Sequence, residues 1–155
     1  MIFVILGTQD KQFKRLLNEV EKIETDEEII VQSGYTKFTS NRMKIFDYLD
    51  MEEFDKYIKQ ADLIICHGGV GTIMTALKNH KVIISSARLS KYGEHQNDHQ
   101  LQLLKPFSDN GFLLQLEDGD DINELYKLAK TFKTKDYIEN NQKFIDLVRN
   151  KINNL

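Results

Sequence analysis

The fold is decided by one stretch of the sequence, Ala61-Asp-Leu-Ile-Ile-Cys66-His67-Gly68-Gly69-Val70-Gly71-Thr72-Ile-Met-Thr75-Ala-Leu77. Its first part, Leu63 to Cys66, is a short unbroken apolar run, which is typical of a parallel strand covered on both faces. Three glycines follow within four positions, where a backbone must bend and leave room for a close approach. Helical spacing of apolar residues resumes from Ile73 to Leu77. Because the start of a helix has free N–H groups and the positive end of the macrodipole, the stretch predicts a phosphate site.

Two well-known phosphate motifs do not fit this turn. It has no Gly-Lys-Ser/Thr, which excludes a P-loop, and Gly69-x-Gly71-x-x-Met74 lacks the third glycine of the dinucleotide fingerprint. A tight strand-to-helix turn without any ligand therefore stays open as the alternative.

The composition is that of an ordinary globular protein. The chain has 155 residues, 41% of them hydrophobic and 29% charged, and we expect one domain over residues 1–155. A net charge of −3 gives no electrostatic reason to expect nucleic-acid binding. The single cysteine, Cys66, has no partner for a disulfide within the chain, which favours a reducing compartment and an inert core thiol.

Neither a signal peptide nor a membrane span is expected. The apolar N-terminal run stops at Leu6 and has no basic residues before it, so it is interpreted as a first buried strand. No segment approaches the roughly 18 apolar residues that a transmembrane helix needs. Any membrane association would therefore come through a partner.

Strands and helices alternate along the chain, which predicts an α/β fold: a Rossmann-like, doubly wound and mostly parallel sheet with its ligands outside the carboxyl ends of the strands. Pro106 should end or kink the helix that contains it, and Asp121 resembles the first residue of a capping box. The last helix has an apolar face that could cover the core or form an interface. We expect strands at Ile2–Leu6, Glu27–Gln32, Met43–Phe46, Leu63–Cys66, Lys81–Ser85 and Phe112–Leu116, and helices over Phe13–Ile23, Met51–Gln60, Ile73–Leu77, Leu101–Phe107, Ile122–Ala129 and Tyr137–Ile152.

A second polar cluster runs from Arg88 to Gln100. It is dense in side chains that both donate and accept hydrogen bonds, which is what recognition of sugar hydroxyls requires. Arg88 and Lys91 could meet a diphosphate. The alternative is a solvated loop in which Asp98 caps the following helix.

Metal and nucleophile chemistry fit the sequence poorly. His95 and His99 could share a helical face, but position 96 is Gln, so the zincin order is absent and no metal is expected. There is no Gly-x-Ser-x-Gly elbow for a serine nucleophile. His67 is the most plausible single polar residue for a functional role, and its side chain either contacts substrate or supports the turn.

Four motifs together resemble the C-terminal domain of family 28 glycosyltransferases, in particular the PssE-type subunit of exopolysaccharide and capsule assembly. The sequence is also similar to the soluble subunit of the two-piece N-acetylglucosaminyltransferase of N-glycan synthesis. The resemblance covers roughly residues 1 to 116. The motifs are Gly7-Thr8, Gln32-x-Gly34, Ala61-Asp-Leu-Ile-Ile-x-His67-x-Gly-x-Gly71-Thr72-Ile and Tyr92-Gly-Glu-His95-x-x-Asp98-His99-Gln100.

The resemblance implies a GT-B fold cut in half, with this chain equivalent to the C-terminal, donor-binding domain. It further implies a UDP-sugar donor and a membrane-anchored PssD-like subunit that binds the lipid-linked acceptor. The chain would then be cytoplasmic and peripheral at the inner face of the membrane, through that partner. We expect no cofactor.

The resemblance also assigns residues. Gly68 to Thr72 would hold the diphosphate with Thr8 nearby, and backbone near Met51 would lie beside uracil. Residues 98 to 100 would contact the donor sugar, in a pocket shaped by residues 94 and 95. The donor-binding residues expected are Thr8, Met51, His67, Gly68, Gly69, Gly71, Thr72, Thr75, Arg88, Glu94, His95, Asp98, His99 and Gln100.

An inverting transfer needs a base for the acceptor hydroxyl and stabilisation of the departing UDP. Arg88 and the helix start could stabilise the departing UDP. The base is expected from the partner, with His67 as the possible catalytic residue of this chain.

Departures from the family pattern keep other functions open. Thr75 stands where many relatives have an acidic residue for the ribose, and Lys81-Val82 and Ser85-Ser86 stand where prolines are frequent. A non-catalytic UDP-sugar-binding or scaffold subunit that activates its partner transferase is the main alternative. A free-standing UDP-sugar epimerase or hydrolase is a third, less favoured because a chain of this length has no room for a second domain.

Overall fold

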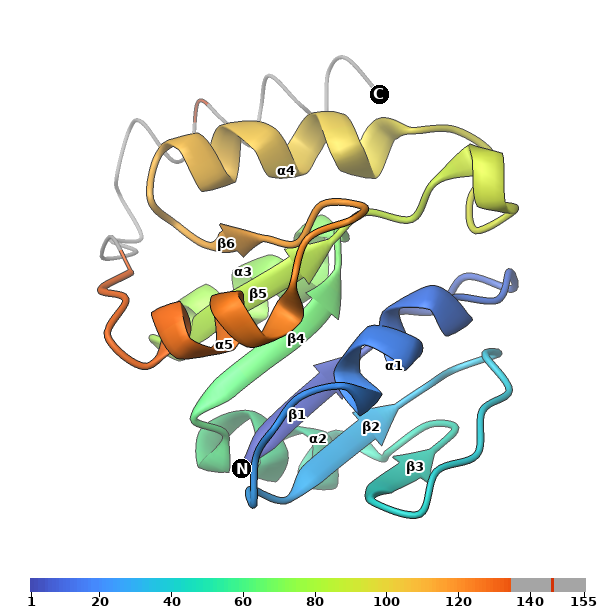
Figure 1. Ribbon diagram of the computed structural model, residues 1–155. Coiled ribbons are helices and arrows are strands. Elements are labelled where there is room, and N and C mark those ends of the chain that lie inside the picture. The colour runs from blue at the N-terminus through green and yellow to red at the C-terminus, as the bar shows by residue number, and fades with distance from the viewer. Residues whose placement is uncertain (135–145, 147–155) are drawn as a thin grey trace.

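A computed structural model describes residues 1–134 and residue 146. Its centre is a six-stranded sheet in the order β3-β2-β1-β4-β5-β6, and every neighbouring pair is parallel (Figure 1). This confirms the predicted Rossmann-like doubly wound sheet. The strands are β1 (Ile2–Ile5), β2 (Ile29–Gln32), β3 (Met43–Phe46), β4 (Leu63–His67), β5 (Val82–Ser86) and β6 (Leu114–Gln115).

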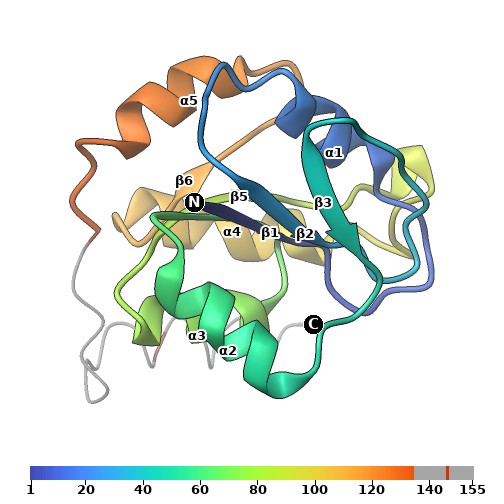
Figure 2. The same cartoon turned by 90° about the horizontal axis from the view of Figure 1, so that it is seen from below.

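Helices cover both faces of the sheet. α1 (Lys14–Glu21) and α5 (Ile122–Ala129) pack on one face, whereas α2 (Met51–Gln60), α3 (Val70–Lys78) and α4 (His99–Asp109) pack on the other (Figure 2). A short 3-10 turn, η1 (Ser90–Tyr92), lies between β5 and α4. The predicted helix over Tyr137–Ile152 lies outside the described residues.

The apolar runs of the strands are explained by burial on two sides. In β1, Ile2 and Val4 face α1 and α5, whereas Phe3 and Ile5 face α2, α3 and α4, and all four are almost fully buried. Cys66 is fully buried on the second face, and burial raises the pKa of its thiol to about 12. The expected place of this thiol in the core is therefore confirmed.

The structure decides two expectations about helix ends, one against the prediction and one for it. Pro106 neither ends α4 nor marks its boundary, because the helix runs through to Asp109. Proline removes one N–H bond, but Leu103, Leu104 and Phe107 are buried on either side of it and hold both turns against the sheet. Asp121 does cap α5, as expected: its carboxylate accepts from the N–H of Asn123 in the first turn.

Within the part of the chain that the structure describes, no helix combines the length and the apolar character needed to cross a membrane.

Candidate functional site

The expected ligand-binding segments meet at one edge of the sheet. Because all strands are parallel, their carboxyl ends lie together, and the strand order reverses direction between β1 and β4. Ile5 of β1 pairs with Cys66 of β4, which places Gly7 next to His67. This edge therefore brings together two of the predicted motifs, the turn after β1 and the glycine turn after β4.

The imidazole of His67 lies in a narrow slot between two glycines. A Cβ atom added at Gly7 would lie 2.5 Å from the ring carbon Cε1, and one added at Gly69 would lie 2.3 Å from it. At Gly68 a Cβ would instead lie 2.9 Å from Cβ of Gln100 on α4. Gly71 differs from these, because nothing lies within 4 Å of its Cβ position. The glycines thus have separate tasks: three make room for buried side chains, and Gly71 leaves the start of α3 open.

The start of α3 has the geometry of an anion site. Its cap residue is Gly69, no side chain caps it, and the first turn has no acidic residue. The positive end of the macrodipole is therefore not neutralised by a cap or by an acidic residue in the first turn of α3. Thr72 lies in this first turn, with its hydroxyl oxygen 3.3 Å from Nε2 of His67.

Gln100 connects the glycine turn to the loop after β5. Its Oε1 accepts from the main-chain N–H of Gly68 and from that of Arg88, both at 3.1 Å. Its Nε2 lies 3.3 Å from Nδ1 of His67. Gln100 is 8% exposed, so this residue, which the sequence predicted to contact the donor sugar, instead forms hydrogen bonds within the protein.

The charge state of His67 follows from its surroundings. Its side chain is 7% exposed, and burial lowers its pKa to about 4, with further lowering by the charges of Arg88 and His95. The ring is therefore neutral at physiological pH, and both of its nitrogens have a polar partner.

This depressed pKa predicts a pH dependence of stability. The unfolded chain protonates His67 near the ordinary histidine pKa of 6.5, whereas the folded chain does so only near 4, so the free energy of unfolding falls as pH drops through that window. The loss attributable to His67 is about 3 kcal/mol. Urea unfolding between pH 7 and about pH 4 measures it. His95→Asn should retain most of the slope and His67→Asn should lose it; equal slopes in all three proteins would contradict the assignment.

Arg88 has a different place from the one expected. The sequence suggested a cation that meets the diphosphate, but the side chain is 1% exposed. Its guanidinium donates to the main-chain carbonyls of Leu6 and Lys11, each at 2.7 Å, and of Glu94 at 3.1 Å. Burial lowers the pKa of Arg88 to about 10, so the group stays charged at neutral pH. Arg88 fastens the loops after β1 and β5 together.

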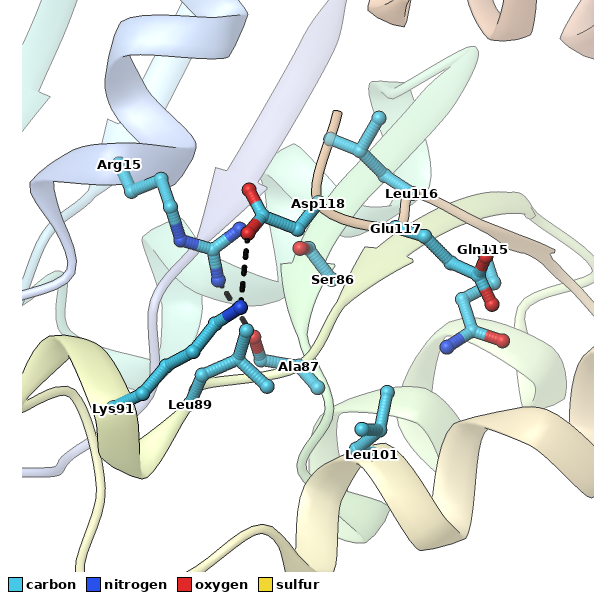
Figure 3. Close-up of a pocket in the computed structure, with 10 residues that line it drawn as sticks. All are labelled: Arg15, Ser86, Ala87, Leu89, Lys91, Leu101, Gln115, Leu116, Glu117 and Asp118. Carbon is cyan, nitrogen blue, oxygen red and sulfur yellow. Dashed lines mark hydrogen bonds and ion pairs between the residues drawn. The ribbon is translucent and has the colours of Figure 1, made fainter. Parts of the chain in front are cut away.

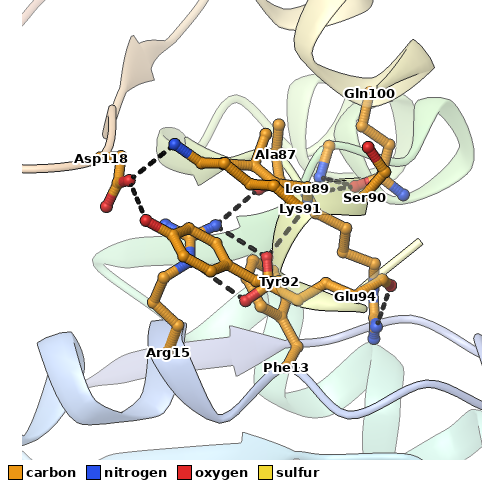
Figure 4. A network of polar contacts seen from close by, with 12 residues as sticks. Phe13, Arg15, Ala87, Leu89, Ser90, Lys91, Tyr92, Glu94, Gln100 and Asp118 are labelled. Carbon is orange, nitrogen blue, oxygen red and sulfur yellow. Dashed lines mark hydrogen bonds and ion pairs between the residues drawn. The ribbon is translucent and has the colours of Figure 1, made fainter. Parts of the chain in front are cut away.

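Glu94 is equally buried and serves the same loop. Its carboxylate accepts two hydrogen bonds from Arg15 of α1, at 3.0 and 2.9 Å, and one from the N–H of Leu89 (Figure 4). Arg15 also donates to the carbonyl of Ala87 and lies beside the ring of Tyr92. Glu94 thus shapes the loop, as expected, and does so through a partner, Arg15, that no motif indicated.

The remaining loop residues are more accessible. Asp98 does not cap α4 with its side chain. Its carboxylate instead accepts from the N–H and the hydroxyl of Ser90, and these bonds lower its pKa. His95 accepts a bond from the N–H of Asn97 and is half-buried, and burial lowers its pKa. His99, at the first position of α4, is also half-buried.

Three other predicted residues lie at the same edge. Thr8 follows Gly7 and is exposed. Met51 begins α2 and is 85% exposed. The hydroxyl of Thr75 donates to the carbonyl of Gly71, one turn back in α3, which leaves its oxygen free to accept. Their roles toward a donor stay predictions.

A pocket that the sequence did not indicate lies at the ends of β5 and β6 (Figure 3). Its volume is about 280 Å³, near the lower end for small-molecule sites. Lys91 and Asp118 form an ion pair at 3.4 Å there, so Lys91, a sequence candidate for contact with a diphosphate, already has a partner. The pocket could not be predicted because its lining comes from segments far apart in the sequence: Arg15, Ser86, Ala87, Leu89, Lys91, Leu101, Gln115, Leu116, Glu117 and Asp118.

Among residues 1–134 and 146, no three His, Cys, Asp or Glu side chains gather in a way that could hold a metal ion.

An open parallel sheet with its polar residues gathered at the carboxyl edge defines the Rossmann-like class of α/β protein. Comparison with family models is more specific: residues 1–151 match the glycosyltransferase family 28 C-terminal domain. The chain belongs to this family.

Solved structures agree with the fold. The solution structure of ALG13 is similar with a TM-score of 0.59 and 19% identity, over 94% of this chain and 93% of that one. The crystal structure of the glycosyltransferase of kitacinnamycin is similar with a TM-score of 0.57 and 12% identity, over 83% of this chain but 34% of that one. This chain therefore spans nearly all of the first structure and about a third of the second. A comparison with curated proteins found no match.

Proposed function

We propose that this chain is the donor-binding subunit of a two-component inverting glycosyltransferase. The enzyme transfers a hexose from a UDP-sugar to a lipid-linked acceptor in exopolysaccharide or capsule biosynthesis. The observation that carries the proposal is the open start of α3 in a family 28 C-terminal domain. There an uncapped helix end, the hydroxyl of Thr72 and the unobstructed Gly71 meet, and these are the groups that a diphosphate needs.

A separate partner is supported by the extent of the structural matches. The similarity to ALG13 runs over nearly the full length of both chains, so this domain also occurs in a chain of similar size. The much larger kitacinnamycin enzyme contains the same fold as one part. We therefore propose a membrane-anchored PssD-like partner that supplies the acceptor site, with this chain held at the cytoplasmic face of the membrane.

The state of His67 supports a catalytic base on the partner. A general base must be able to reach the acceptor hydroxyl and take its proton. His67 is buried and both ring nitrogens face protein groups, so it acts as support for the turn. The departing UDP would be stabilised by the start of α3, and no metal or cofactor is needed for that step.

Titration calorimetry with UDP, GDP and ADP, followed by several UDP-sugars, tests the proposal. Selective UDP binding is expected. Gly71→Trp should weaken it at least ~10-fold, because a Cβ at this position meets no atom within 4 Å and the large side chain beyond it would occupy the open helix start. Lys78→Trp, at the exposed far end of α3, is the control and should bind normally. If neither the chain nor its co-expressed complex with the partner binds UDP, the donor site is not here.

The alternative is a non-catalytic UDP-sugar-binding or scaffold subunit that activates its partner. It is favoured by the engagement of Gln100, Arg88 and Glu94 with protein groups. The Glu94 carboxylate only accepts hydrogen bonds, and the hydrogens left for a sugar are those on Nε and one on Nη2 of Arg88 and one on the amide of Gln100. In that case Gly71→Trp would abolish UDP binding to the chain, yet the complex would keep its transfer activity.

A further inference from the structure

Three side chains at the carboxyl edge form a continuous line of contacts. It begins at Gln100 on α4, passes through the ring of His67 at the end of β4 and ends at the hydroxyl of Thr72 in the first turn of α3. The positions of the hydrogens along this line can be worked out, because two main-chain N–H groups hold one end of the Gln100 amide.

The orientation of the Gln100 amide is fixed by the main chain. Two N–H groups, those of Gly68 and Arg88, point to the same terminal atom of the side chain. A main-chain N–H can only donate, so this atom must be the oxygen. The NH₂ group of the amide then points to Nδ1 of His67.

The tautomer of His67 follows from that orientation. An NH₂ group has only hydrogens to offer, so Nδ1 must accept and cannot carry a proton. A neutral imidazole has one N–H, which therefore lies on Nε2 and donates to the oxygen of Thr72. A protonated ring would set the N–H at Nδ1 against the NH₂ of Gln100, which burial of the pair makes costly.

The hydroxyl of Thr72 then keeps its own hydrogen for another acceptor. Its oxygen accepts from His67, and within residues 1–134 it has no second hydrogen-bond partner. A hydroxyl that accepts a hydrogen bond is also a better donor, because hydrogen bonds in a chain polarise one another. The hydroxyl of Thr72 and the free N–H groups at the uncapped start of α3 would then both offer hydrogens.

We infer that Gln100 is a positioning residue that fixes His67 as the Nε2–H tautomer, so that the hydroxyl of Thr72 donates a hydrogen bond to a phosphate oxygen at the start of α3. The last step rests on the proposed function; the first two do not. Such a site selects ligands whose oxygens only accept, as those of an ionised diphosphate do, over ligands that present hydroxyl hydrogens.

Two-bond ¹H–¹⁵N spectra of the chain labelled with ¹⁵N-histidine report which ring nitrogen holds the proton. His67→Asn identifies the His67 signals by their loss. At pH 7 the wild-type ring is expected to carry its proton on Nε2. Gln100→Glu should move a proton to Nδ1, because a carboxylate oxygen accepts where the NH₂ donated. Gln102→Glu makes the same change on the exposed face of α4 and should leave the spectrum unaltered.

A wild-type ring protonated on Nδ1, or a His67 spectrum unaffected by Gln100→Glu in a folded protein, would overturn the inference. The wild-type spectrum alone decides the tautomer if that variant does not fold.

Calorimetry with UDP tests the final step separately. Thr72→Val keeps the shape of the side chain without the hydroxyl and should weaken UDP binding ~10-fold or more, as loss of a hydrogen bond to a charged group does. Thr72→Ser should bind as the wild type does. If UDP binds equally to Thr72→Val, the hydroxyl does not face the ligand. If the wild type and its complex bind no UDP although the tautomer is as stated, the proposed function fails and the positioning role of Gln100 remains.

Discussion

Gly7→Ala is expected to lower the free energy of unfolding by about 4 kcal/mol, a large share of the stability of a small domain. Two causes add. Gly7 has a φ of +79°, which costs a residue with a Cβ roughly 1–2 kcal/mol. The new methyl group would also lie 2.5 Å from Cε1 of His67, and overpacking of this kind costs roughly 1–3 kcal/mol.

The ring of His67 has no free direction in which to move away. Gly69 closes its other side, where an added Cβ would lie 2.3 Å from the same atom. Gln100 and Thr72 contact its two nitrogens. The strain is therefore expected to remain in the folded state, and urea unfolding at neutral pH measures it.

Other glycines of the chain separate the two causes. Gly93 has a φ of +69° and Gly119 one of +92°, and neither has any atom within 4 Å of its Cβ position. Gly93→Ala and Gly119→Ala should show only the backbone cost. Adding His67→Ala to Gly7→Ala should recover the rest, with a coupling energy of about 2 kcal/mol in the double-mutant cycle. A loss in Gly7→Ala no larger than in Gly93→Ala would mean that the ring is free to move.

Much of the fold could be predicted because local and long-range signals agree. β3 and α2 have the bounds that the sequence indicated, and Asp50 caps α2 through its contact with the N–H of Glu53. Apolar runs located all six strands, but for the five other than β3 at least one end differs from the expected one. Phe112 and Leu113 are buried yet lie before β6, because burial and strand pairing are separate requirements and an apolar pattern reports only burial.

The glycines located the candidate site in the sequence, but they did not show which side chains pack against them. A glycine shows that a side chain would not fit, not which neighbour excludes it. At Gly7 and Gly69 that neighbour is His67, and at Gly68 it is Gln100. These neighbours come from β4 and α4, so the reason for each glycine depends on packing between segments that no local pattern connects.

Arg88 illustrates the same limit for charge. A cation within a polar loop indicates exposure and a ligand, since isolated charges avoid the protein interior. Its burial is possible only because the carbonyls of Leu6, Lys11 and Glu94 converge on the guanidinium and Phe13 lies beneath it. Two of these carbonyls are about eighty residues away along the chain, so a single sequence gives no sign of the arrangement.

Arg88→Met is therefore expected to destabilise the protein by about 3–5 kcal/mol, which urea unfolding at neutral pH measures. Methionine can fill much of the volume, but the three carbonyls remain in the interior without donors. Arg88→Lys should also be strongly destabilised, because one ammonium group cannot reproduce the planar fork that reaches carbonyls from three segments.

Lys91→Met is the matched control, since Lys91 lies in the same loop and is the other cation that the sequence offers for the diphosphate. Its side chain is 63% exposed and its ion pair with Asp118 is at the surface, so its loss should leave the free energy of unfolding unchanged within error. Calorimetry with UDP on the folded fraction completes the test. If Arg88→Met were as stable as Lys91→Met and had lost UDP binding, Arg88 would be a ligand of the diphosphate after all. The loops after β1 and β5 would then be held together by other contacts, of which the Arg15–Glu94 pair is the first to examine.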